Sequence, residues 1–113
     1  MDNAINQYQQ IIKQVLTEYV EYMADDTSQT EDVLLFDDEN KAYSLFNVGW
    51  QNGRRIQIMI VLMRVVGGKI YVEEDNSDYD FVEQLLTAGI RSRDIVLAWH
   101  PPEMRSHTEY AIA

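Results

Sequence analysis

The stretch WQNGRRIQIMIVLMRVVGG, residues 50–68, decides the fold because it places a long apolar segment between two turn signals. Asn52-Gly53 is the strongest turn dipeptide in the chain, since a type I′ turn needs positive φ at both central residues. Gly67-Gly68 is a second two-residue turn. The segment between them predicts a strand that pairs antiparallel with both of its neighbours. Both side-chain sets of residues 56–63 are largely apolar, so we expect a central strand with both faces mostly covered.

The neighbouring segments alternate as strands do. Upstream, residues 33–36 and 41–50 predict two strands, and the run DDEN between them favours a turn. In the second of these strands Tyr43 and Leu45 face one side, and Ala42, Ser44, Phe46 and Val48 face the other. Downstream, residues 69–75 predict another strand. The middle of the chain therefore predicts an antiparallel meander of about four strands.

Residues 3–23 predict an amphipathic helix, because apolar and tyrosine side chains recur there at spacings of three and four. This stripe consists of Ile5, Tyr8, Ile12, Val15, Tyr19 and Tyr22. Asp2 or Asn3 is suited to cap the start of the helix. We expect the stripe to pack on the sheet. The alternative is a homodimer, formed by a two-helix seam between copies or through an uncovered sheet face.

The last third of the chain predicts a second helix. It is expected to begin with Ser77 as its cap and Asp80 in a weak capping box. Its apolar face consists of Val82, Leu85 and Leu86. Gly89 suits a left-handed helix end, and Ile90 the apolar contact that accompanies a Schellman turn.

Residues 95–99 (IVLAW) predict a short buried strand. Asp94 is expected either to cap the turn that leads into this strand or to pair with Arg91. Residues 101–108 predict a turn or short helix with proline at its first positions, and residues 109–113 a final strand. The whole pattern predicts a single α+β domain over residues 1–113, with one mainly antiparallel sheet and helices packed on it.

The composition is that of a small globular protein. Its 113 residues fit one domain, and 46% of them are hydrophobic. The chain has no cysteine, which excludes a disulfide framework and suits a reducing cytoplasm. The N-terminus lacks a signal-peptide pattern, and the longest apolar run is broken by Arg64 and is too short to cross a bilayer. We therefore expect a cytoplasmic protein that does not interact with a membrane.

Negative charge is concentrated in the first half of the chain. The formal net charge is −10, and residues 1–53 carry −8 of it, since ten acidic residues are opposed only by Lys13 and Lys41. Such a field repels nucleic acid and attracts basic partners, so tight direct DNA binding is not expected. From the residues alone, the favoured interpretation of the acidity is that it serves solubility, and steering of a basic partner is the alternative.

The common catalytic and cofactor motifs are absent from the sequence. It contains no GxGxxG, Walker A, HExxH or GxSxG motif. His100 and His107 are seven residues apart, but Pro101 and Pro102 prevent a continuous helix that would align them as metal ligands. We therefore predict a non-enzymatic protein without a cofactor or metal.

Three places offer side chains for contact with a partner. They are the acidic turn, the Asn52-Gly53 turn and the strand end before the two prolines. The candidate partner-binding residues are Asp37, Asp38, Glu39, Trp50, Arg54, His100 and Arg105.

The strand end also permits an enzymatic hypothesis. His100, Glu103 and Arg105 could line a pocket there and form a small hydrolase or nucleotide-binding site. The favoured prediction is structural: the prolines fix the backbone, His100 bonds locally, and an arginine satisfies carboxylates or carbonyls at the strand end.

Several segments in combination resemble the XisI family. They are NVGWQNGRRI at 47–56, GGKIYVEED at 67–75 and LLTAGIRSRDIVLAWHPPEMRSHTEYAIA at 85–113. Gly49-Trp50 and His100-Pro101-Pro102 are among the most telling pieces. Length, motif order and the tyrosine-bearing first helix also match, so the resemblance covers nearly the whole chain.

Members of that family are described as fdxN element excision controlling factors and occur largely in cyanobacteria. The resemblance implies a controlling factor in a programmed DNA rearrangement during heterocyst development, with the strand chemistry done by a separate recombinase. It implies a XisH-like partner, a second small factor that looks like a nuclease-fold protein. Family members also occur outside the excision element, where restraining such a partner is an alternative task. The resemblance carries over no catalytic residue.

Overall fold

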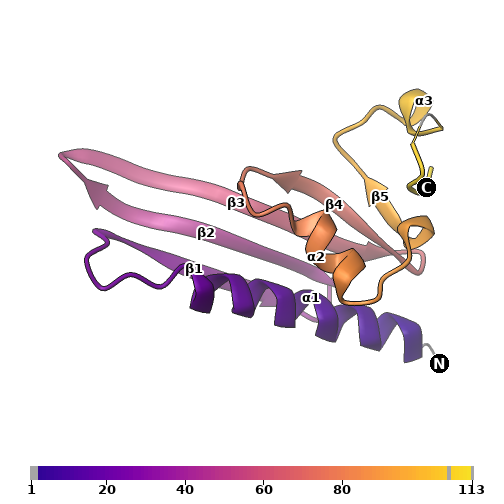
Figure 1. Cartoon of the computed structure of the whole chain (residues 1–113), viewed down its shortest axis with the longest axis horizontal. Coiled ribbons are helices and arrows are strands. Elements are labelled where there is room, and N and C mark those ends of the chain that lie inside the picture. The colour runs from indigo at the N-terminus through magenta and orange to yellow at the C-terminus, as the bar shows by residue number, and fades with distance from the viewer. Residues whose placement is uncertain (1–2, 107, 113) are drawn as a thin grey trace.

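A five-stranded sheet forms one layer of the structure and the two longer helices form the other (Figure 1). The computed structural model describes residues 3–106 and 108–112. The elements follow in the order α1 (Asn3–Tyr22), β1 (Thr30–Asp37), β2 (Ala42–Gln51), β3 (Arg54–Val66), β4 (Lys69–Asp75), α2 (Phe81–Thr87), a 3₁₀ turn (Ser92–Asp94), β5 (Ile95–Leu97) and α3 (Pro102–Arg105). The strand order is β1-β2-β3-β4-β5. The first four strands are antiparallel and β5 is parallel to β4, which confirms the predicted α+β class and the meander.

The two predicted hairpin turns are confirmed. Asn52 and Gly53 have φ values of 54° and 79°, and Gly67 and Gly68 have 58° and 79°. Positive φ at both central residues is what a type I′ turn requires. These turns fix the registers that pair Gln51 with Arg54 and Val66 with Lys69.

A β-bulge in β3 sets which of its side chains reach the core. Leu45 pairs with Val61, but Phe46 pairs with Met59, so Ile60 is the extra residue of the bulge. Ile60 and Val61 are both buried as a result, at 9% and 0% exposure.

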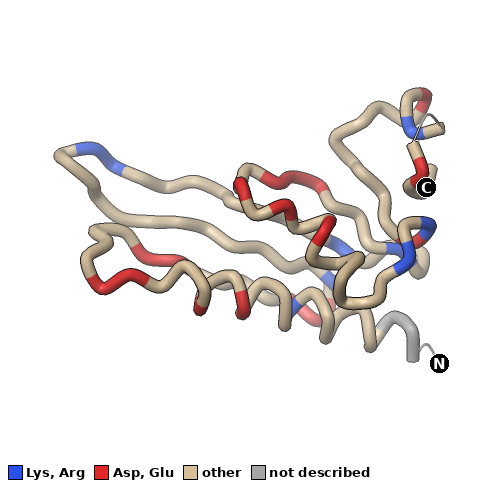
Figure 2. The backbone as a smooth tube through the Cα atoms, in the orientation of Figure 1, with Lys and Arg blue, Asp and Glu red and all other residues tan. Residues whose placement is uncertain are grey.

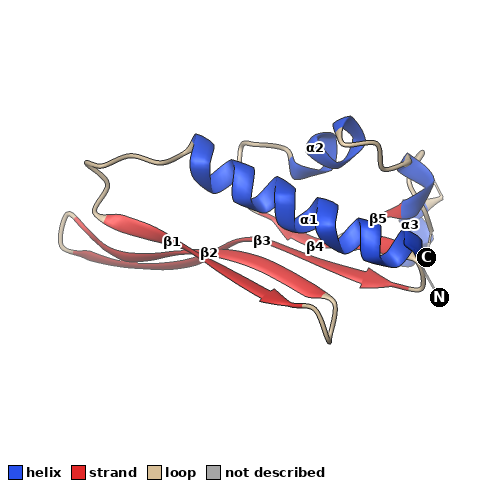
Figure 3. Cartoon of the chain, turned by 90° about the horizontal axis from the view of Figure 1, so that it is seen from below, coloured by secondary structure: helices blue, strands red, loops and turns tan. Residues whose placement is uncertain are grey.

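The helices cover one face of the sheet only, as Figure 3 shows. The fully buried sheet side chains on the covered face are Tyr43, Leu45, Val61, Met63, Ile70, Val72 and Ile95. On the opposite face Leu35 is 53% exposed, and Phe46, Met59 and Leu62 are half-buried. The central position of β3 is confirmed, but the prediction that both of its faces are covered is wrong. Apolar side chains that pair across strands on this bare face, such as Phe46 and Met59, are only half-buried because no helix covers them.

The first helix ends within one residue of its predicted end, and its stripe packs on the sheet as expected. Three stripe residues are buried: Ile12, Val15 and Tyr19. Leu16 is buried beside them, whereas Tyr22 is 74% exposed. The Asp2 cap and the side chain of Ile5 lie outside what the structure describes. No helix among residues 3–106 and 108–112 has the length and apolarity needed to cross a bilayer.

The second helix begins later than predicted. Its N-cap is Asp80, whose carboxylate accepts the backbone N–H of Glu83. The prediction of Ser77 as the cap is wrong because Asp75, at the end of β4, accepts hydrogen bonds from both the backbone N–H and the hydroxyl of Ser77. Asp75 also accepts the N–H of Phe81, the first residue of α2.

The predicted end of α2 is confirmed as a Schellman motif. The N–H of Gly89 donates to the carbonyl of Leu86, and the N–H of Ile90 donates to that of Leu85. Ile90 is buried at 3% exposure, so the accompanying apolar contact is made.

The C-terminal segment is only partly as predicted. β5 is short and buried, and α3 begins with Pro102, as expected. The strand ends at Leu97, however, two residues earlier than predicted, and Trp99 is 48% exposed rather than buried. The final strand predicted at 109–113 is wrong over residues 109–112, which form bends and coil. A backbone hydrogen bond from Ala111 to Ile95 joins this segment to β5, but no ladder of bonds follows it within the described residues.

Candidate protein-interaction site

Two adjoining cavities lie between the C-terminal end of α1 and the sheet. One is bordered by α1 and strands β1 to β3, and the other by α1, β3 and residues 76–79. Each has a volume of about 500 Å³. We call the combined hollow the α1 groove; its apolar and aromatic lining includes Tyr19, Tyr22, Met23, Ile58, Ile60 and Tyr79.

The lengths of the elements explain the groove. β3 has 13 residues, which at about 3.3 Å each extend over about 43 Å, whereas the 20 residues of α1 span about 30 Å. The β2–β3 hairpin therefore projects beyond the end of α1 (Figure 1). Ile58 lines the groove on the helix-covered side of β3, yet it is 53% exposed because the helix has ended there.

Carboxylates surround the α1 groove. Asp25 and Asp32 line one cavity, and Asp78 lines the other. Figure 2 shows further acidic residues along α1 and in the loop that follows it. Burial raises the pKa of the Tyr19 hydroxyl, and the charges of Asp32, Asp75 and Asp78 raise it further. The groove thus combines an apolar floor with a negative rim.

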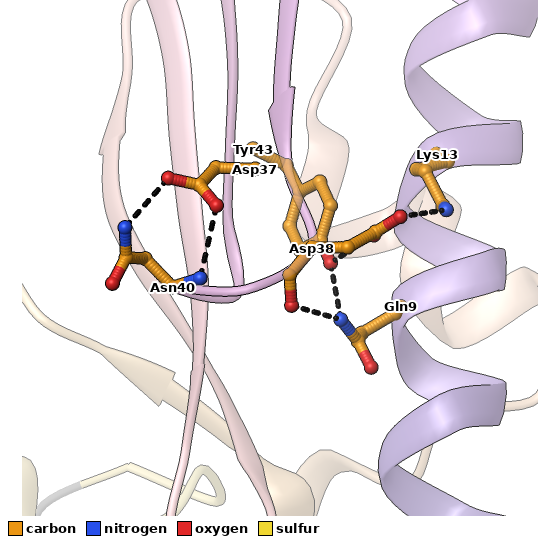
Figure 4. A network of polar contacts seen from close by, with 6 residues as sticks. All are labelled: Gln9, Lys13, Asp37, Asp38, Asn40 and Tyr43. Carbon is orange, nitrogen blue, oxygen red and sulfur yellow. Dashed lines mark hydrogen bonds and ion pairs between the residues drawn. The ribbon is translucent and has the colours of Figure 1, made fainter.

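The acidic turn between β1 and β2 is tied to α1 by a polar network (Figure 4). Asp38 accepts hydrogen bonds from the Tyr43 hydroxyl at 2.7 Å and from the Lys13 ammonium at 3.0 Å. Gln9, only 7% exposed, donates to the Tyr43 hydroxyl at 2.5 Å. Burial and the bond to Asp38 raise the pKa of Tyr43 to about 12. The bonds from Tyr43 and Lys13 lower the pKa of Asp38.

The predicted partner-binding residues do not form one surface. Asp37 closes the turn by accepting the backbone and side-chain N–H groups of Asn40, at 2.9 and 2.7 Å, while Glu39 is exposed at the tip. Trp50, 59% exposed, and Arg54 lie at the other end of β2. The ten residues of that strand separate the two groups by about 30 Å.

Arg105 holds the C-terminal segment over the end of β5. Its guanidinium donates to the backbone carbonyls of His100, Ile112 and Ala98, at 3.0, 3.0 and 3.4 Å. The structural role predicted for Arg105 is confirmed. His100 is half-buried, and its backbone N–H donates to the Leu97 carbonyl at 3.1 Å.

A smaller cavity, of about 370 Å³, lies beside the same strand end. It is lined by Asp75, Ser77, Asp78, Asp80, Val82, Leu97, Trp99 and Tyr110. His100 and Arg105 do not line it, and Glu103 is exposed on α3. The hypothesis of a hydrolase or nucleotide site at these three residues gains no support from this cavity and stays a prediction.

Asp94 connects the 3₁₀ turn to α1. It accepts hydrogen bonds from the Tyr8 hydroxyl and from the Arg91 guanidinium, the latter at 3.1 Å, so the predicted pairing with Arg91 is confirmed. Burial acts to raise the pKa of Asp94, but the hydrogen bonds from Tyr8 and Arg91, together with the charges of Arg91 and Lys69, hold the pKa below its usual value.

Within residues 3–106 and 108–112, no group of three or more histidine, aspartate or glutamate side chains could hold a metal ion. His107, one of the two histidines considered as ligands, lies outside the described residues.

The α1 groove was not predicted from the sequence. Periodicity placed Tyr22 on the packed stripe, and alternation placed Ile58 in a strand covered on both faces. The sequence did contain a signal for it. The two turn dipeptides mark the ends of β3, and the strand between them is longer than α1.

The chain is similar to known proteins along nearly all of its length. A family model described as XisI protein matches residues 1–112. One solved structure, a XisI-like protein from Anabaena variabilis, is 32% identical with a TM-score of 0.88, over 96% of this chain and 99% of that one.

A second solved structure is the fdxN element excision controlling factor XisI from the same organism. It is 31% identical with a TM-score of 0.83, over 98% of this chain and 100% of that chain. No match was found among curated proteins. The family model and both structures agree with the resemblance seen in the sequence, and the chain belongs to the XisI protein family.

Proposed function

We propose that this chain is a controlling factor of programmed DNA excision that acts by binding a second protein, a XisH-like factor, and performs no chemistry itself. Support comes from its place in the XisI family and from its similarity to a protein named as an excision controlling factor. A role during heterocyst development and a cytoplasmic location belong to the same proposal.

The observation that carries the proposal is the distribution of charge. Residues 1–53, a range that includes α1, β1 and β2, carry −8 of the net −10. Acidic residues lie along α1 and in the loop that follows it (Figure 2). A surface of this kind attracts a basic protein and speeds its association.

The same charge argues against a direct hold on DNA. A protein binds duplex DNA by neutralising phosphates with lysine and arginine, and net negative charge opposes this. The basic pair Arg54 and Arg55 is confined to the tip of the β2–β3 hairpin (Figure 2). Control of excision is therefore exerted through a protein that itself contacts DNA, by occupying or reshaping its basic surface.

Co-purification tests this proposal. The tagged chain is expected to retain a XisH-like protein from the same genome at low ionic strength and to release it as salt is added, because screening weakens contacts between exposed charges. An unrelated acidic protein of similar size serves as the control for non-specific charge binding. Failure to retain the XisH-like protein at any salt concentration would contradict the proposal.

A further inference from the structure

The α1 groove exposes apolar surface at one end of the molecule. Tyr22, Met23 and Ile58 are 74%, 50% and 53% exposed, and all three line the same cavity. Single exposed apolar side chains are ordinary, but a contiguous group around a hollow is typical of a surface that binds another protein.

We propose that the α1 groove is the docking site for the protein partner. It receives a partner segment that inserts one or two large apolar side chains, flanked by lysine or arginine residues that meet the acidic rim. This inference rests on the proposed function and adds to it the place of contact and the chemistry that is recognised.

The size and lining of the groove fit such an anchor. Each cavity, at about 500 Å³, lies within the range of about 300–1,000 Å³ that is usual for ligand sites. Tyrosine and methionine are enriched at protein interfaces because they offer much contact area. One wall is preformed, since the Tyr19 and Tyr79 rings pack edge to face with centroids 4.9 Å apart.

The rim selects the charge of the partner. Asp25 is held in place by the hydroxyl and backbone N–H of Thr27, at 2.7 and 2.9 Å, and these bonds lower its pKa. Asp32 accepts the side-chain amide of Asn47 at 3.0 Å. With exposed Asp78 on the other side, these carboxylates attract a cationic segment and repel an acidic one.

The uncovered face of the sheet, which is also partly apolar, does not select a partner by charge. On the uncovered sheet face, half-buried side chains such as Phe46 and Leu62 lie on the same face as the Arg64–Glu73 ion pair, whose charges are 2.8 Å apart. Both signs are present there, so the charge favours no particular partner. Because its rim is acidic, the α1 groove favours a partner segment of positive charge, and the uncovered sheet face favours neither charge.

Paired substitutions test the inference. Ile58→Thr removes the apolar floor but keeps a β-branched residue, and Leu35→Thr is its matched control, because Leu35 is also 53% exposed but on the bare face. Asp78→Lys reverses a rim charge, and Glu109→Lys reverses another exposed acid, in the C-terminal segment. Calorimetric titration with the XisH-like protein measures each affinity, and thermal unfolding checks that all four variants fold.

Both groove variants are expected to weaken binding about tenfold or more, and both controls less than about threefold. Equal affinity of Ile58→Thr and Leu35→Thr, with binding by the unchanged chain intact, would overturn the docking site and leave the proposed function standing. No binding by the unchanged chain would overturn both. If Ile58→Thr instead dissociates a dimer of this chain and leaves XisH-like binding intact, the groove serves a second copy and the inference is wrong.

Discussion

Tyr43 shows how one buried side chain ties the sheet to α1. Its hydroxyl donates to Asp38 and accepts from Gln9, and the ring is fully buried. Tyr43→Phe leaves the buried Gln9 amide poorly bonded, so we expect the free energy of unfolding to fall by about 1–3 kcal/mol in chemical denaturation at neutral pH. Tyr22→Phe is the control, because Tyr22 is 74% exposed, and should change stability by less than about 0.5 kcal/mol. Equal losses in the two variants would contradict the role assigned to this network.

The raised pKa of Tyr43 predicts a loss of stability in alkali. The folded pKa is about 12, above the usual 10.0, so the protonated hydroxyl favours the folded state. This contribution is present below pH 10 and is lost as the pH rises towards 12. The stability gap between the unchanged chain and Tyr43→Phe should therefore narrow across that window, as measured by denaturation at several pH values. If the difference in stability stays constant between pH 10 and 12, the raised pKa of Tyr43 does not contribute to stability as stated.

Gly49 of β2 lies close to the backbone at the start of β1. Its φ is 150°, and a Cβ placed there would lie 2.9 Å from the Gln29 carbonyl oxygen and from the Thr30 Cα. Gly49→Ala is expected to cost about 1–3 kcal/mol in the free energy of unfolding, because backbone atoms must move. Gly53→Asn is the control: it has open space around it and a left-handed φ that asparagine tolerates. A neutral Gly49→Ala would contradict this steric account.

At the scale of elements, Arg105 fastens α3 and the last residues to the end of β5. Its guanidinium donates to three backbone carbonyls through Nε, Nη1 and Nη2, a fixed fork of donors that lysine cannot reproduce. Arg105→Lys should lower the free energy of unfolding by about 1–3 kcal/mol in thermal or chemical denaturation. Arg93→Lys, at an exposed position of the 3₁₀ turn, is expected to be neutral. If both variants unfold alike, the clamp assigned to Arg105 is wrong.

Local patterns predicted the elements well where the deciding contacts are local. The two hairpin turns, the first helix and the Schellman end of α2 depend on residues a few positions apart, and all are confirmed. The start of α2 was mispredicted because Asp75, which belongs to β4, captures Ser77. The last segment was mispredicted because Arg105, on α3, binds the carbonyl of Ile112. In both cases a side chain from another element forms the hydrogen bond: Asp75 binds the predicted cap, and Arg105 binds a backbone carbonyl of the predicted strand.

At the scale of the whole molecule, the charge of the first half is visible in the sequence but the docking groove is not. The groove exists because a 13-residue strand projects past a 20-residue helix, so it depends on how the two layers are aligned. Of the predicted site residues, the structure uses Asp37, Asp38 and Arg105 to hold turns and segments together. A partner-binding role for Glu39, Trp50, Arg54 and His100 stays a prediction, as does a homodimer through the bare sheet face, which light scattering tests.

Hydrogen–deuterium exchange on the mixed proteins tests the central claim most directly, because it reports both whether the chain contacts a XisH-like protein and where. We expect slower exchange in residues 19–32 and 76–79, which border the α1 groove, and little change in β5 and α3. Unchanged exchange throughout, or protection confined to residues 98–105, would contradict the claim that this chain works by docking a partner at the α1 groove.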